Sequence, residues 1–199
     1  MPWLTLTVSA LAWIVAVVPG LGASLALESA PLASGEVWRL WTGHLAHWSG
    51  SHLAWDLAVF VVGAAWLERT AGARRLARLL FVGGAVVGAA VLCLRPDLAS
   101  YRGLSGIDCA LVAGVAVHLA RVRPWPVLLV AAGLCAKVVY ETTTGAGAFA
   151  GSLGAGVVVV PEAHVVGALV GALLEFCAPI PTLNESSFSA ESSISTDSF

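Results

Sequence analysis

Two side chains that could carry out acyl transfer, Ser105 and His164, lie in otherwise apolar stretches of the sequence. A serine hydroxyl is a weak nucleophile until a neighbouring base removes its proton. His164 is the candidate base, because it is the one histidine of the later apolar segments at a matching depth. The glycines at 103 and 106 flank the serine and leave room for a substrate backbone to approach. The pattern predicts nucleophilic catalysis by Ser105 and His164.

Small residues recur at helical spacing in the same two segments. Gly106, Ala110 and Gly114 are four residues apart, and Gly167 and Gly171 form a GxxxG motif. Faces of this kind allow helices to approach closely in lipid. We therefore expect the two helices to pack together and to bring the serine and the histidine within hydrogen-bonding distance.

A second polar group lies further upstream, where His52 and Asp56 are four residues apart and hence on one face of a helix. Polar groups inside a bilayer are costly unless they are paired or face a cavity, so they indicate function by default. Simpler explanations stay open. His47 and His52 could anchor the protein near lipid headgroups, and Ser105 could bond back to its own helix.

Four more polar side chains fall within apolar stretches: Asp108, His118, Lys137 and Glu162. Lys137 and Glu162 could neutralise each other between neighbouring segments. Asp108 could cap or pair locally, and His118 is expected to be structural.

Composition defines the environment in which these residues act. Of 199 residues, 58% are hydrophobic and only 11% are charged, with a mean hydropathy of +0.88. Soluble domains carry roughly 25% charged residues, so the chain is expected to be an integral membrane protein in a lipid bilayer. The formal net charge of -2 excludes the basic excess of a nucleic-acid-binding protein.

Six apolar stretches approach the roughly 20 residues that a spanning helix needs. They are residues 3–27, 52–67, 76–94, 104–120, 125–140 and 153–178. The prediction is an all-α polytopic membrane protein, a six-helix bundle over residues 1–180 with a long outer loop at 28–51. The first stretch could instead be a signal peptide, although it lacks a basic start.

Arginines predict the orientation of the bundle. Arg69, Arg74, Arg75 and Arg78 crowd the loop after the second stretch, and basic residues favour the cytoplasmic side. Both termini are then cytoplasmic, and the loop at 28–51 faces outward. Residues 181–199 are serine-rich and acidic, which predicts a disordered cytoplasmic tail.

The four cysteines, Cys93, Cys109, Cys135 and Cys177, lie in apolar runs. They are expected to be small buried hydrophobic side chains, since no CxxC or Cys/His cluster is present. No metal is predicted, because the histidines lack ligand spacing with cysteines or carboxylates. No cofactor is implied either, since Ser-His acyl transfer needs none.

Four motifs together resemble the rhomboid family of intramembrane serine proteases. They are Glu36-Val-Trp-Arg39, His47-Trp-Ser-Gly-Ser-His52-Leu-Ala-Trp-Asp56, Gly103-Leu-Ser-Gly106 and Ala163-His-Val-Val-Gly167-Ala-Leu-Val-Gly171. They occur in the family's order and cover nearly the whole chain. The resemblance implies a dyad of Ser105 and His164 without a carboxylate, and an oxyanion bound by the Ser105 N–H and His52. It also implies that the substrates are membrane-anchored proteins and that the active site opens to the outer side.

The sequence WRLWTGHLAHWSGSHLAWD is most similar to the rhombosortase branch, whose bacterial members are thought to process C-terminal sorting anchors. Two positions depart from the family pattern. Asp56 replaces the usual asparagine, a third donor to the oxyanion, so it either is protonated and donates there or stays charged and orients His52. Cys109 replaces an aromatic residue that packs on the catalytic histidine. The ring of His164 must then be held by something else. The alternatives are an inactive relative that binds membrane proteins, and a small transporter with a polar relay.

Overall fold

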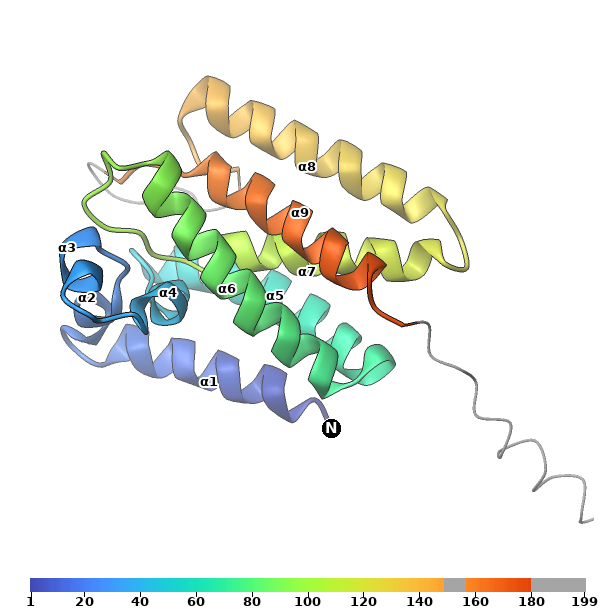
Figure 1. Cartoon of the computed structure of the whole chain (residues 1–199), viewed down its shortest axis with the longest axis horizontal. Coiled ribbons are helices and arrows are strands. Elements are labelled where there is room, and N and C mark those ends of the chain that lie inside the picture. The colour runs from blue at the N-terminus through green and yellow to red at the C-terminus, as the bar shows by residue number, and fades with distance from the viewer. Residues whose placement is uncertain (149–156, 180–199) are drawn as a thin grey trace, which may run out of the picture.

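The computed structural model describes residues 1–148 and 157–179, which fold into a bundle of helices (Figure 1). The long helices are α1 (Trp3–Val17), α5 (Gly50–Ala71), α6 (Ala73–Leu94), α7 (Ser105–Ala120), α8 (Trp125–Thr144) and α9 (Pro161–Phe176). The short ones are α2 (Leu21–Leu25), α3 (Ser29–Ala33), α4 (Arg39–Thr42) and η1 (Gly43–Leu45). Within the described residues, the predicted all-α class is confirmed.

The predicted spans differ from the helices in extent. By length and composition, α5, α6 and α8 could each cross a membrane, and α1 and α7 are shorter apolar helices. A continuous span over 3–27 is wrong, because α1 ends at Val17 and the chain turns at Gly20, whose φ is +80°. The last predicted span begins at 153, but α9 begins at Pro161. Residues 153–156 and the predicted tail at 181–199 lie outside the described residues.

Helix α7 is the centre of the bundle and packs on α5, α6, α8 and α9. Its contact with α9 is the tightest, as the small residues predict. A Cβ on Gly167 would overlap the carbonyl of Gly106, and one on Gly171 would overlap the carbonyl of Ala110. The predicted approach of these two faces is therefore confirmed.

The outside of the bundle is apolar, as expected for contact with lipid. Val62, Phe81, Leu128 and Leu169 are each exposed by more than half, Val62 by 73%. The prediction of four buried cysteines is wrong for three of them. Cys109 is buried, whereas Cys93, Cys135 and Cys177 are exposed, and all four are free thiols.

The segment before α5 is fixed against the start of α7. Leu27 and Tyr101 exchange two backbone hydrogen bonds, of 3.1 and 2.9 Å. Trp41 stacks on Phe81 with a centroid separation of 5.1 Å and donates its indole N–H to the Phe81 carbonyl. Arg39 donates to the carbonyl of Ala26 at 2.6 Å. These contacts position the residues that precede Ser105.

Candidate active site

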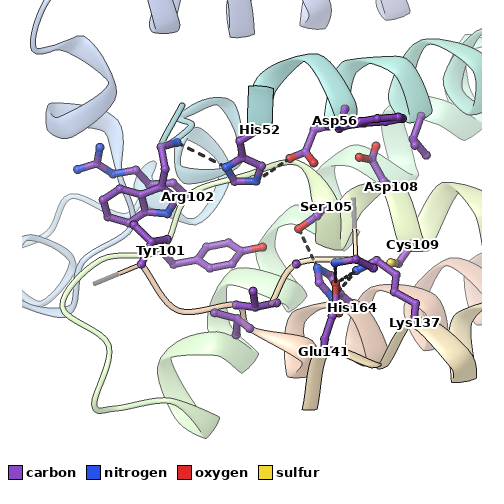
Figure 2. A pocket seen from close by; sticks show the side chains of 18 of the residues that line it. His52, Asp56, Tyr101, Arg102, Ser105, Asp108, Cys109, Lys137, Glu141 and His164 are labelled. Atoms are coloured by element: carbon purple, nitrogen blue, oxygen red, sulfur yellow. Dashed lines mark hydrogen bonds and ion pairs between the residues drawn. The ribbon is translucent and has the colours of Figure 1, made fainter. Parts of the chain in front are cut away.

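Ser105 and His164 meet at the end of the α7–α9 contact. Ser105 is the first residue of α7, and His164 lies in the first turn of α9. His164 Nε2 is 2.9 Å from Ser105 Oγ, and Figure 2 shows the serine side chain directed at the imidazole. The close packing at Gly106 and Gly167 makes this short distance possible.

The pair lines a cavity of about 320 Å³ between α5, α7, α8 and the chain that leads into α9. This volume is at the lower end of the range typical of small-molecule sites, roughly 300–1,000 Å³. The walls are largely apolar, with Trp55, Val59 and Val112 among them. The polar lining residues include Ser105, His164, His52 and Asp56.

The other ring nitrogen of His164 contacts a carboxylate that the sequence analysis missed. His164 Nδ1 lies 2.7 Å from Glu141 Oε2 and 3.0 Å from Lys137 Nζ, and Lys137 also bonds to Glu141 Oε1. A dyad without a carboxylate neighbour is therefore not what the structure contains. A sequence signal was present, since Lys137 and Glu141 are four residues apart on one face of an apolar helix.

The suggested neutralisation of Lys137 by Glu162 is wrong. Glu162 lies 3.6 Å from Arg95 at the C-terminal end of α6, and Lys137 pairs with Glu141, four residues further along its own helix.

His52 and Asp56 form a second polar cluster beside the serine. Asp56 Oδ2 accepts a hydrogen bond from the Leu104 N–H at 2.9 Å. The same oxygen lies 3.3 Å from His52 Nε2 and 3.2 Å from His47 Nε2. Asp56 therefore connects α5 to the backbone turn that presents Ser105.

Gly103 and His44 shape that turn. Gly103 has φ +128°, which L side chains rarely adopt, and a Cβ there would come within 2.9 Å of the His52 ring. His44 Nδ1 is 3.2 Å from the Gly103 carbonyl, and its Nε2 is 3.1 Å from the Gly84 carbonyl. Burial lowers the pKa of His44 and so favours its neutral form. The sequence analysis did not identify His44.

The remaining predicted residues are distributed as follows. Cys109 and Asp108 line the cavity and are buried. Asp108 Oδ1 has no hydrogen-bond partner in the described part of the chain, so local pairing does not account for that atom. Arg39 does not line the cavity, and Gly171 lies one turn deeper in the α7–α9 contact.

In this site a serine and an imidazole meet in a cavity of an apolar helical bundle. The comparison with known protein families agrees with such a site. The family model of the rhomboid domain matches residues 34–179, about three quarters of the chain. The protein therefore belongs to the rhomboid family, whose members are generally intramembrane serine proteases. No curated protein sequence matches the chain significantly.

Proposed function

We propose that this protein is an intramembrane serine endopeptidase in which Ser105 is the nucleophile and His164 the general base. The 2.9 Å contact between Ser105 Oγ and His164 Nε2 carries the proposal. His164 takes the hydroxyl proton as Oγ attacks the scissile carbonyl, and returns it to the leaving amine. Water then hydrolyses the acyl-enzyme ester, with His164 again acting as the base.

The oxyanion of the tetrahedral intermediate would be held by the Ser105 N–H and by His52. The Ser105 N–H is available because the first N–H groups of a helix have no partner within it. The contact of Asp56 with His52 Nε2 holds a proton on that nitrogen, beside Gly103. In this mechanism Asp56 accepts hydrogen bonds and orients His52. The His52 N–H either turns from Asp56 to the oxyanion or is shared between the two.

The substrates would be membrane-anchored proteins, cleaved near the outer end of a spanning segment. The six long helices would all cross or enter the bilayer, with both termini on the cytoplasmic side. Figure 1 shows the N-terminus of α1, the junction of α5 with α6 and the last turn of α9 at the same end, and Arg74 is the second residue of α6. Similarity to the rhombosortase branch favours the bacterial inner membrane and substrates with C-terminal sorting anchors.

The orientation is testable by labelling intact cells with an impermeant thiol reagent. The variants Ser34→Cys and Arg74→Cys, in a background without the four native cysteines, place exposed thiols at opposite ends of the bundle. Only the thiol at position 34 should react. Labelling at position 74 instead would place the active site on the cytoplasmic side.

The catalytic assignment is testable with a fluorophosphonate probe and a fluorogenic membrane-anchored peptide. Ser105→Ala should lose both labelling and cleavage, and His164→Ala should lose cleavage. The double variant should be no worse than either single variant, because nucleophile and base act as a unit. Ser100→Ala is the matched control, since Ser100 lines the same cavity. Turnover by Ser105→Ala would refute the proposal.

A further inference from the structure

Helix α8 is an outlier in the bundle, because it is largely exposed and buries one side chain of its 20, that of Glu141. Glu141 is only 3% exposed, whereas Leu128 of the same helix is 72% exposed. A carboxylate inside a membrane helix is costly, and such residues generally mark functional positions. The buried partner of Glu141 on the neighbouring helix is His164, at 2.7 Å.

The geometry determines which ring nitrogen carries the proton. An ionised carboxylate only accepts hydrogen bonds, so the contact with Glu141 Oε2 requires an N–H at His164 Nδ1. A neutral imidazole has a single N–H. Nε2 is then left with its lone pair, facing Ser105 Oγ at 2.9 Å. This is the tautomer that can accept the serine proton.

Lys137 is positioned to favour the opposite tautomer of His164. Its ammonium group only donates, and its Nζ lies 3.0 Å from His164 Nδ1. A hydrogen bond from Lys137 to Nδ1 would leave that nitrogen unprotonated and put the proton on Nε2. His164 could not then accept the proton of Ser105. Glu141 also binds the Lys137 ammonium through Oε1, which provides that ammonium with another acceptor.

From these contacts we infer that Glu141 is a positioning residue that fixes the tautomer and orientation of His164, so that the site works as a Ser105–His164–Glu141 triad. The inference rests on the proposed function. It also identifies what holds the His164 ring, since the position one turn after Ser105 offers only the small side chain of Cys109.

The kinetic test compares Glu141→Gln with a matched control, Glu175→Gln. Glu175 is also buried, and its Oε1 also lies 2.7 Å from the Nδ1 of a histidine, His118. In Glu141→Gln, the kcat for cleavage of the fluorogenic substrate should fall roughly 10²–10⁴-fold, with KM nearly unchanged. Glu141→Asp should recover part of the loss, and Glu175→Gln should stay within about twofold of wild type.

A spectroscopic test needs no activity. The ¹⁵N spectrum of the histidine-labelled full-length protein reports which ring nitrogens are protonated, and the His164 signals are those that vanish in His164→Phe. Protonated Nδ1 and bare Nε2 are expected in the wild type. In Glu141→Ala, a population with protonated Nε2 should appear.

The outcomes separate the inference from the proposed function. If Ser105→Ala is inactive but Glu141→Gln keeps full kcat, or falls no further than Glu175→Gln, the inference is wrong and the protease assignment stands. A wild-type His164 protonated at Nε2 would also overturn the inference. If Ser105→Ala keeps activity, the protease proposal fails, and the ¹⁵N spectrum still decides whether Glu141 fixes the tautomer.

Discussion

The two ends of α9 carry two histidine–carboxylate contacts of equal length. At the N-terminal end of α9, His164 Nδ1 lies 2.7 Å from Glu141 Oε2. At the opposite end, Glu175 Oε1 lies 2.7 Å from the Nδ1 of His118, on α7. Both carboxylates are nearly fully buried, and each also pairs with a cationic side chain. The contact alone therefore does not distinguish a catalytic histidine from a structural one.

The difference lies on the far side of each ring. His164 presents Nε2 to Ser105 Oγ in a cavity, whereas the ring of His118 packs edge-on against Trp66 at 5.5 Å. In the proposed mechanism, the carboxylate contact prepares His164 as a base at one end of α9, whereas the matching contact at the other end belongs to a packed interface. The group that faces Nε2 of each histidine makes this difference.

The pair of Glu175 and His118 belongs to a cluster with several cations that holds the C-terminal end of α9. Arg121 donates to the carbonyls of Glu175 and Ala178, at 2.6 and 2.9 Å. Arg78 donates to the carbonyl of Leu174. Positive charge at a helix C-terminus is favourable, because the last carbonyls lack partners within the helix. This cluster anchors the helix that carries His164.

The largest effect should come from separating α7 and α9 near Ser105 and His164 alone. Gly167→Leu would push α9 away from the Gly106 carbonyl, and a 1 Å displacement of the base can cost about a hundredfold in rate. The kcat for the fluorogenic substrate should fall by at least that factor. Leu169→Phe is the control, since Leu169 is 59% exposed, and it should be nearly silent. Equal activity of Gly167→Leu and wild type would contradict the role of this contact.

A smaller loss should follow from Asp56→Asn, which alters the polar group across the cavity. An asparagine amide oxygen in the place of Oδ2 can still accept from the Leu104 N–H and face His52, but the negative charge that holds a proton on His52 Nε2 would be lost. If Asp56 orients His52, kcat should drop by about tenfold at every pH, less than the loss of an oxyanion donor. Asp56→Ala should cost at least as much. An asparagine variant as active as the wild type across the pH range would show that Asp56 acts as a donor instead.

The smallest effect on activity should come from the C-terminal end of α9. Arg75→Met removes the 2.6 Å ion pair with Glu175 and should lower the free energy of unfolding by about 1–3 kcal/mol. The change is measured as a lower Tm in detergent, with kcat at 25 °C within about twofold of wild type. A loss of kcat as large as that of Gly167→Leu would show that the two ends are coupled and not separate.

The sequence by itself determined much of the site, because its signals are local. Small residues spaced four apart along α7 and along α9 predict a helix contact, and that contact brings Ser105 and His164 together. The i, i+4 spacing of His52 and Asp56 likewise predicts their proximity, since one helical turn fixes it. The apolar composition predicts a helical membrane protein before any residue is placed.

Tertiary structure decided which charged groups meet across helices. Glu162 of α9 lies against Arg95 and not against Lys137, and the packing of α8 on α9 brings Glu141 to His164. The end of α1 at Val17, by contrast, has a local signal in Pro19-Gly20, which mean hydropathy does not register. A helical period places a side chain on a face, but the rotation of that face toward a partner follows from the close packing of the whole bundle.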